Sequence, residues 1–381
     1  MGFFTAPRIA WGAGAIEQLS ALGATSALLV VDRKLAKADR HRRVVEELEK
    51  TSTRIEVLDS LTPTVEGVEA AKGRAQASNP DWIIAFGGGS TIDAAKGLWL
   101  RTAGPQRPLR ELTPLVDLGL RPRTRFVAIP TTSGSGNEAS WTCRLRSSEG
   151  RAVEVASREL VPDWALLDPG LPATMDPELT ASSGAMLLAN AFEAVASAWA
   201  NPFSDSLARA AIGATMTNLP RAVRHPDDVE ARSALHYAAT MAGLAVSNSQ
   251  AGFARALSDA FSDIFGIPSR KGLAVVLPYV LEFNFPSARD RYSLLSSELG
   301  SGATGSRSSI AERVRALYTS VGLPRTLVDL KIPAEQLEER VEDLVSHVEA
   351  STSVRANPRI PSRDELRQLI IALRTGASIG F

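Results

Sequence analysis

Residues Trp82–Gly97 read W-I-I-A-F-G-G-G-S-T-I-D-A-A-K-G, and in this stretch an apolar run meets three glycines and then a helical pattern. Ile83–Phe86 has the length and apolar character of a buried strand. From Ile92 onward the apolar residues return at helical spacing. A strand, a glycine turn and a helix start in this order bring backbone N–H groups and the positive end of a helix together. The stretch therefore predicts a phosphate cradle for a dinucleotide, or else a tight turn that needs positive φ angles.

The composition excludes several classes of protein. The chain has 381 residues, 44% hydrophobic and 22% charged, which is enough for one large or two ordinary domains. Lys and Arg number 42, as do Asp and Glu, so a net charge of zero gives no electrostatic reason to bind nucleic acid. The single cysteine, Cys143, excludes an internal disulfide framework and a cysteine-built metal site. We find no secretion signal and no apolar run of membrane-spanning length, so we expect a cytoplasmic protein without a membrane partner.

The first part of the chain alternates strand-like and helix-like segments, which is typical of a parallel sheet with crossover helices. The predicted strands are Ala27–Asp32, Ile55–Leu58, Trp82–Phe86, Phe126–Ile129 and Ala165–Leu167. The spacing of apolar residues predicts a helix over Val65–Ala77. We therefore expect an α/β domain over residues 1–176.

The second part of the chain has segments rich in alanine and leucine at helical spacing, and strand signals nearly vanish. The predicted helices are Ala181–Trp199, Asp205–Leu219, Asp228–Ser247, Ala251–Phe265, Ile310–Val321, Pro333–Val348 and Arg363–Leu373. The polar run Gly300–Ser306 is expected to be a surface loop. We therefore expect a helical domain over residues 177–381, with a cleft between the two domains.

Polar side chains after two other predicted strands also point to a dinucleotide. Asp32 ends a strand, where a carboxylate can accept hydrogen bonds from an adenosine ribose and would repel a 2′-phosphate, which favours NAD over NADP. The alternative for Asp32 is the N-cap of a helix. Thr131, Thr132 and Ser135 lie in a glycine-rich loop, with hydroxyls suited to a phosphate or a ribose, and the alternative is an ordinary polar loop.

Motifs of one family occur in the same order along most of the chain. They are Gly12–Gly14, Gly87–Lys96, Ile129–Glu138, Glu193 with Ala200–Asp205, and Asn357–Arg359. On these segments the sequence resembles the iron-containing alcohol dehydrogenase family, which includes maleylacetate reductases and lactaldehyde reductases. The resemblance implies an α/β N-terminal Rossmann-like domain plus an all-α C-terminal domain, the iron-containing alcohol dehydrogenase-like or dehydroquinate synthase-like fold. With the strand-end residues above, it implies that NAD or NADP contacts Asp32, Gly87, Gly88, Gly89, Ser90, Asp93, Thr131, Thr132 and Ser135.

The metal ligands of this family have no counterpart here. The resemblance implies a divalent metal held by one aspartate and three histidines of the helical domain. The residues at or near those four positions are Met186, Asn190, Arg255 and Lys271. The chain has four histidines, and no two of them are spaced i,i+4. Because zinc and ferrous iron need imidazole, thiolate or carboxylate ligands, we predict no metal at this site.

The basic residues at this position predict a different chemistry. A metal-independent, NAD-dependent oxidoreductase acting on a hydroxyl would use Lys271 as general base and Arg255 and Arg270 as fixed positive charge. A base beside fixed positive charge suits a β-hydroxy acid, which has both a hydroxyl and a carboxylate. Its oxidation gives a β-keto acid that loses CO2 readily. Degenerate relatives of the family occur in natural-product pathways of the daptide-like type. There, a peptide with a C-terminal threonine is such a β-hydroxy acid.

Three other hypotheses compete with this one. The chain is a non-catalytic subunit that supports a partner enzyme, or a reductase of a small aldehyde or ketone. Alternatively, Arg255 and Lys271 are solvated residues around a disused pocket, with Asp259 as their ion-pair partner. The expected partners are a small-molecule or peptide substrate, and the assemblies left open are a homodimer and a complex with a partner protein.

Overall fold

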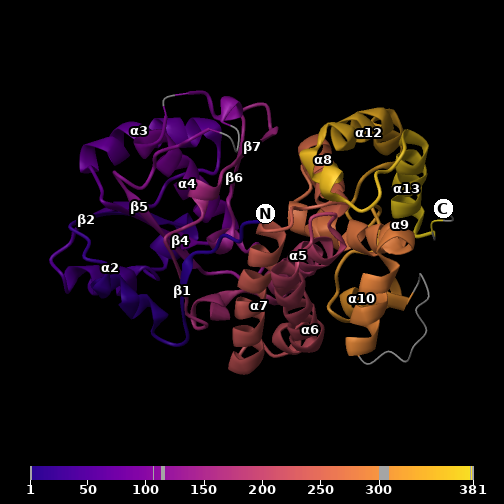
Figure 1. Cartoon of the computed structure of the whole chain (residues 1–381), viewed down its shortest axis with the longest axis horizontal. Coiled ribbons are helices and arrows are strands. Elements are labelled where there is room, and N and C mark those ends of the chain that lie inside the picture. Colours follow the sequence, from indigo (N-terminus) through magenta and orange to yellow (C-terminus); the bar gives the residue numbers. More distant parts are fainter. Residues whose placement is uncertain (1, 106, 113–115, 300–308, 378, 380–381) are drawn as a thin grey trace. The chain divides into compact units, whose positions relative to one another are not determined.

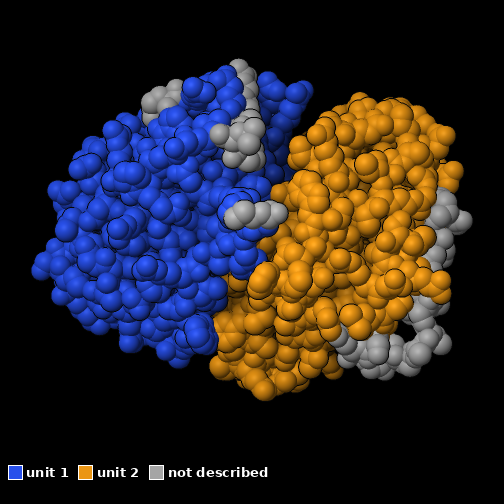
Figure 2. Space-filling model, in the orientation of Figure 1, with its two compact units in different colours: residues 1–174 blue, residues 175–381 orange. Residues whose placement is uncertain are grey.

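The computed structural model describes residues 2–105, 107–112, 116–299, 309–377 and 379. The chain divides into two compact units, residues 1–174 and 175–381 (Figure 2). The division falls two residues before the boundary that the change in sequence pattern predicts, after residue 174 instead of 176. The predicted surface loop Gly300–Ser306 lies outside the described residues.

Unit 1 is built on a six-stranded parallel sheet in the order β1-β8-β5-β4-β2-β3. Its strands are β1 (Arg8–Trp11), β2 (Ser26–Val31), β3 (Arg54–Leu58), β4 (Trp82–Gly87), β5 (Arg125–Pro130) and β8 (Trp164–Leu167). Every residue of β2 and β4 is buried, which explains why these strands are continuous apolar runs without alternation. The predicted Rossmann-like α/β architecture is therefore confirmed.

Helices cover both faces of this sheet, on opposite sides of the strands in Figure 1. Because side chains alternate between faces along a strand, α3 (Val65–Ser78) and α4 (Gly89–Ala103) pack on one set of strand residues. The 3₁₀ helix η1 (Ala15–Ala21) and α2 (Arg42–Glu49) pack on the alternate set. The short elements of unit 1 are α1 (Arg33–Lys37), η2 (Leu109–Glu111), η3 (Asn137–Ala139), η4 (Arg158–Leu160) and η5 (Leu171–Thr174). An antiparallel pair that the sequence pattern did not predict is formed by β6 (Thr142–Arg146) and β7 (Ala152–Ala156).

Unit 2 is helical in the residues that the structure describes. Its elements are α5 (Pro177–Ala196), α6 (Pro202–Arg224), α7 (Val229–Ser247), α8 (Phe253–Phe265), α9 (Ser269–Glu298), α10 (Ser309–Ser320), α11 (Ala334–Glu339), α12 (Val341–Ala350), η6 (Thr352–Ala356) and α13 (Arg363–Thr375). The helix predicted over Pro333–Val348 is divided into α11 and α12 at Arg340, and α9 was not predicted. Among the described helices, none combines the length and apolar character that a membrane span requires.

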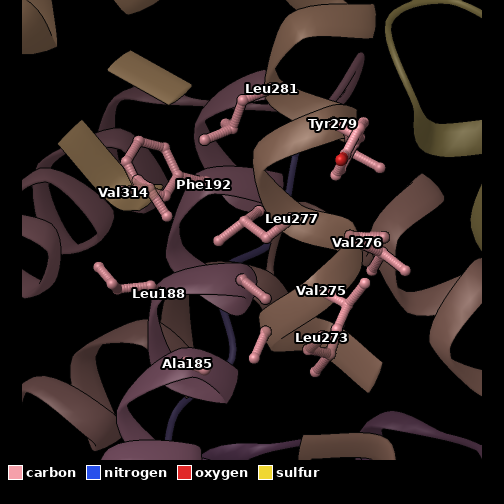
Figure 3. Packing of buried hydrophobic residues seen from close by; sticks show 14 of the residues in the cluster. Ala185, Leu188, Phe192, Leu273, Val275, Val276, Leu277, Tyr279, Leu281 and Val314 are labelled. Carbon is pink, nitrogen blue, oxygen red and sulfur yellow. The ribbon is translucent and has the colours of Figure 1, made fainter. Parts of the chain in front are cut away.

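Helix α5 is central to the core of unit 2 because it is buried along most of its length. It starts at a favourable cap, where the Asp176 carboxylate accepts a hydrogen bond of 2.7 Å from the backbone N–H of Leu179. One face of α5 meets the apolar face of α9, and Figure 3 shows Leu188 and Phe192 near Leu277 and Leu281. This packing places the first turn of α9, which carries Arg270 and Lys271, beside the first half of α5.

Candidate functional site

The first predicted cofactor loop joins β4 to α4. Strand β4 ends at Gly87, Gly88 is the N-cap of α4, and the helix proper begins at Gly89. Among the described residues, no side chain caps this helix end. The N–H of Thr91 donates to the carbonyl of Gly88 at 3.0 Å, so among the described residues those of Gly89 and Ser90 are left for an anion, and the helix dipole adds positive potential.

The three glycines of this loop are needed for close packing. None of them has a positive φ angle, so the alternative of a tight turn with left-handed residues is wrong. A Cβ on Gly89 would lie 2.5 Å from Oγ of Ser135, and one on Gly87 would lie 2.6 Å from Oγ1 of Thr91. A Cβ on Gly88 would lie 3.3 Å from Oγ1 of Thr132. The second predicted loop therefore packs directly against the first.

That second loop follows β5, the neighbour of β4 in the sheet. Its first residue, Thr131, donates a backbone hydrogen bond of 3.0 Å to the carbonyl of Gly87. Further along, Nδ2 of Asn137 donates to the carbonyl of Gly89 at 3.2 Å and to Oδ2 of Asp93 at 2.8 Å. The structure thus brings together the residues that the sequence assigned to two separate glycine-hydroxyl loops.

Asp93 and Lys96 of α4 contact the second loop from within the core. Asp93 is 8% exposed and Lys96 is fully buried. Nζ of Lys96 donates to the carbonyls of Asn137 at 2.8 Å and Ser140 at 2.7 Å. Burial raises the pKa of the Asp93 carboxyl and lowers the pKa of the Lys96 ammonium. Sequence reasoning did not single out Lys96 or Asn137, although the i,i+3 spacing of an acid and a base after a phosphate loop was a usable signal.

Asp32 follows β2, on the other side of β4 in the sheet. Its backbone N–H donates to the carbonyl of Phe86 at 3.1 Å, which places it at the same sheet edge as the glycine loop. Oδ1 of Asp32 accepts hydrogen bonds from the backbone N–H groups of Lys34 at 2.8 Å and Leu35 at 3.3 Å. Asp32 is thus the N-cap that the sequence gave as the alternative, and its contact with a ribose stays a prediction.

In unit 2, a stripe of residues spaced three or four apart runs along α5. It consists of Glu178, Ser182, Met186, Asn190 and Glu193. All three predicted basic residues extend from α8 or α9 to this α5 stripe. Nζ of Lys271 lies 2.6 Å from Oε1 of Glu178.

The two arginines meet the same stripe nearer its middle. Nε of Arg270 donates to Oγ of Ser182 at 3.1 Å, and Nη2 of Arg255 donates to Oδ1 of Asn190 at 2.9 Å. Their positions differ in exposure, because the partner of Lys271, Glu178, has a side chain that is 74% exposed, whereas Asn190 is buried. The structure therefore gathers the three cations along one helix, with a buried partner for each arginine and an exposed partner for Lys271.

Glu193 is a buried carboxylate at the end of the α5 stripe. Its Oε1 accepts a hydrogen bond of 2.9 Å from the backbone N–H of Arg255, in the first turn of α8. Its Oε2 has no hydrogen-bond partner among the described residues. Burial raises the pKa of Glu193. Sequence reasoning quoted Glu193 only as part of a family motif and gave it no role.

These residues do not fit a divalent metal ion. In the part of the chain that the structure describes, no group of three or more His, Cys, Asp or Glu side chains is arranged to hold one. At the four positions that the resemblance marks, the groups are a thioether, an amide oxygen bonded to Arg255, a guanidinium, and an ammonium paired with Glu178. Such cations and neutral groups do not supply the anionic or imidazole donors that zinc and ferrous iron require.

Comparisons with known proteins match nearly the whole chain. Residues 6–169 match the model of the family described as iron-containing alcohol dehydrogenase, and residues 180–373 match that of its C-terminal part. The chain belongs to the iron-containing alcohol dehydrogenase family. This membership confirms the predicted class of enzyme, an NAD(P)-dependent dehydrogenase that acts on CH–OH groups.

Two curated members and one solved structure illustrate the similarity. The chain is 30% identical to an NADPH-dependent butanol dehydrogenase of Clostridium saccharobutylicum, over 99% of both chains. It is 33% identical to an alcohol dehydrogenase of Thermococcus barophilus, over 81% of this chain and 80% of that one. The structure of an iron-containing alcohol dehydrogenase from Thermococcus thioreducens covers 99% of this chain with 31% identity and a TM-score of 0.91.

Proposed function

We propose that this family member oxidises the hydroxyl-bearing carbon of a hydroxy acid with NAD and without a bound metal ion. One observation carries the proposal. Two positions that the family resemblance marks as metal ligands, Asn190 and Arg255, are joined by a hydrogen bond of 2.9 Å between an amide oxygen and a guanidinium. A guanidinium already supplies a permanent positive charge at this point, and a second cation beside it would be repelled.

Arg255 is suited to bind the carboxylate of such a substrate. Its guanidinium carries five N–H donors, and only Nη2 is used in the bond to Asn190 that we describe. The two-point geometry of a guanidinium matches a carboxylate. The Glu193 carboxylate holds the backbone of Arg255 at the first turn of α8, so the base of the side chain is fixed. We infer that Arg255 binds the substrate carboxylate and Arg270 adds positive charge nearby.

Lys271 is the proposed general base. Its ion pair with Glu178 is exposed, and such pairs contribute roughly 0–1 kcal/mol, so Lys271 can leave it at small cost. In its neutral form Lys271 would take the hydroxyl proton while the carbon–hydrogen bond breaks and its electron pair leaves as hydride. NAD, held at the nucleotide loops, would supply the acceptor for that hydride. The result is a ketone, reduced cofactor and protonated Lys271.

A β-hydroxy acid would continue to a second product. Its oxidation gives a β-keto acid, in which the bond between the carboxylate carbon and the neighbouring carbon breaks, CO2 leaves, and that neighbouring carbon takes a proton. A peptide with a C-terminal threonine is one such β-hydroxy acid. Oxidative decarboxylation is therefore the outcome that we propose for substrates of this class.

The experiment is a mass-spectrometric assay of the purified protein with NAD and a panel of β-hydroxy acids, threonine-terminated peptides and simple alcohols. We expect NADH and CO2 to form in equal amounts from the acids. Arg255→Gln should weaken the binding of acids far more than that of alcohols, since only the acids carry the bound group. Turnover of simple alcohols alone would favour the ordinary alcohol dehydrogenase reaction, and activity only with an added partner would favour the supporting-subunit hypothesis.

Variants of the two basic residues in the α9 turn test the base directly. Lys271→Met should lower kcat by ~10²–10⁴-fold with little change in NAD affinity, because general base catalysis contributes on this scale. Arg270→Met should have a smaller effect, since its guanidinium is held by Ser182. Full activity in both variants on the true substrate would show that the proposed cationic mechanism is wrong.

A further inference from the structure

A cavity lies in unit 1, at the end of the sheet opposite to the nucleotide loops. It has a volume of about 510 Å³ and is lined by Arg8, Ala21, Leu22, Trp82, Arg121, Arg125, Asp163 and Trp164. Several of these residues begin strands, namely β1, β4, β5 and β8, whereas Gly87 and Pro130 end theirs. Five steps along β4 span ~16 Å at ~3.3 Å per residue, so the cavity is separate from the cofactor loops. Its volume is that of a small-molecule site.

Four of the lining side chains share one face of the sheet. Arg8 is paired in register with Trp164, and Trp82 with Arg125. Val127, two residues after Arg125, is in turn paired with Trp164. Because paired residues point to the same face and side chains repeat every two residues, all four extend from the face that η1 and α2 cover. The end of η1 supplies the apolar wall, Ala21 and Leu22.

Arg8 and Arg125 are held by aromatic rings and lack an anion. The guanidinium carbon of each lies 5.6 Å from the ring centre of a tryptophan, Trp164 for Arg8 and Trp82 for Arg125. Among the described residues, neither guanidinium has a carboxylate or hydrogen-bond acceptor as partner. A guanidinium over an indole face is attracted to the ring, and its N–H donors, which lie in its own plane, can still bind an anion.

The third arginine and the single acid of the cavity neutralise each other. Nε of Arg121 donates to Oδ1 of Asp163 at 3.0 Å, and its other nitrogens donate to the carbonyls of Glu159 and Val161. Oδ2 of Asp163 accepts from the backbone N–H of Phe126 at 2.9 Å. Asp163 is therefore not the counter-ion of Arg8 or Arg125, and the cavity keeps two uncompensated positive charges.

We propose that this cavity binds the phosphate group of a small phosphorylated metabolite. A phosphate dianion carries two negative charges and several acceptor oxygens, which match the two uncompensated arginines of the cavity better than a single carboxylate does. The remaining volume and the apolar wall accept an organic portion of sugar size. The strands that begin at this cavity end at the cofactor loops, so a ligand here stabilises the same sheet that positions the cofactor.

Calorimetry tests this proposal with ribose 5-phosphate, inorganic phosphate and ribose, at constant ionic strength. The protein is saturated with NAD so that the nucleotide loops are blocked. We expect one equivalent of ribose 5-phosphate to bind, inorganic phosphate to bind more weakly, and ribose not to bind. Arg8→Gln and Arg125→Gln should each weaken ribose 5-phosphate at least tenfold, and Arg125→Lys by less, because a lysine keeps the charge and loses the fork. The matched control is Arg151→Gln, the same change at an exposed arginine on the β6–β7 turn.

Three outcomes would overturn the proposal. The first is equal affinity of ribose 5-phosphate for the wild type, the two glutamine variants and the Arg151→Gln control. The second is binding of the phosphate only at concentrations where it acts as general salt. The third is a change in oligomeric state in Arg8→Gln, seen by light scattering, without loss of phosphate binding, because the arginines would then serve contact with a second copy. Melting temperatures of all variants establish that each is folded.

Discussion

At the scale of single residues, the two nucleotide loops pack so closely at Gly89 that no residue with a side chain fits there. A Cβ on Gly89 would lie 2.5 Å from Oγ of Ser135, a distance that forces one loop away from the other. Overpacking of this kind costs about 1–3 kcal/mol. Gly89→Ala should therefore raise the KM for NAD about tenfold or more at little change in the fold. The control is Gly73→Ala in helix α3, where an added Cβ has no atom within 4 Å and NAD kinetics should not change.

Asp32 combines two roles that a pair of substitutions separates. It caps α1, and we predict that it also selects NAD by repelling the 2′-phosphate of NADP. Asp32→Ser keeps a good N-cap and removes the negative charge, whereas Asp32→Ala removes both. We expect Asp32→Ser to improve NADP affinity in calorimetry while the melting temperature stays near that of the wild type. If NADP already binds as tightly as NAD to the wild type, Asp32 is only a cap.

Glu193 gives stability a defined dependence on pH. Burial raises its pKa in the folded state, so the folded protein holds a proton that the unfolded chain releases. The contribution of Glu193 to the free energy of unfolding is fully present below the unfolded pKa of about 4.5. It is lost as pH rises through the folded pKa. Glu193→Gln keeps an oxygen for the Arg255 N–H and should remove this part of the decline. Urea denaturation of the wild type and of Glu193→Gln between pH 4.5 and 7 measures this part of the free energy of unfolding. The same decline with pH in both proteins would contradict the assignment to Glu193.

At the scale of elements, α4 and the second cofactor loop act as one unit. Lys96 holds the backbone of residues 137–142, and Asn137 ties that segment to Gly89 and Asp93. Lys96→Met should raise the KM for NAD more than it lowers kcat, because it displaces a binding loop and no reacting group. The double variant Asp93→Asn with Asn137→Asp exchanges donor and acceptor and should recover part of the NAD affinity lost in Asn137→Asp alone. Equal affinity in the single and double variants would show that this hydrogen bond does not position the loop.

Elements with strong local signals could be predicted from the sequence, and the others could not. Strand β4 is apolar throughout and ends in a glycine, and β5 is apolar after Arg125 and ends in a proline, so their composition identifies both as buried strands. Helix α9 was missed because Pro278 and Pro286 lie inside its span, and the backbone is kinked at Ala288, two residues after Pro286. Strand β6 alternates polar and apolar residues over only five positions, which is a weak local signal, and its pairing with β7 is a tertiary effect. Contacts such as Lys271 with Glu178 depend on where two helices meet, which no local pattern encodes.

At the scale of the whole molecule, the chain has the family fold, and we propose that the chemistry at the marked ligand positions differs. The apolar contacts that build each unit do not involve the marked ligand positions, except that Met186 packs at the edge of the unit 2 core. The Arg255 guanidinium and the Lys271 ammonium therefore leave the apolar packing of unit 2 in place. Similarity over nearly the full chain, at 31% identity and a TM-score of 0.91, therefore reports on the fold and leaves the donor set at these positions open to test.

Metal content is the property on which this difference is most directly tested. The chain has four histidines and one cysteine, and the described residues hold no group of three acidic, histidine or cysteine ligands. We therefore expect protein purified without chelator to contain far less than one equivalent of zinc or iron by elemental analysis. Dialysis against a chelator should leave kcat and the melting temperature unchanged, and added zinc or ferrous iron should not raise activity. The double variant Arg255→His with Asn190→His is the matched comparison. It places two imidazole donors at adjoining positions and should gain measurable metal affinity. An equivalent of metal retained by the wild type through dialysis, with activity lost on its removal, would mean that ligands from elsewhere in the chain complete a metal site and that Arg255 has another role.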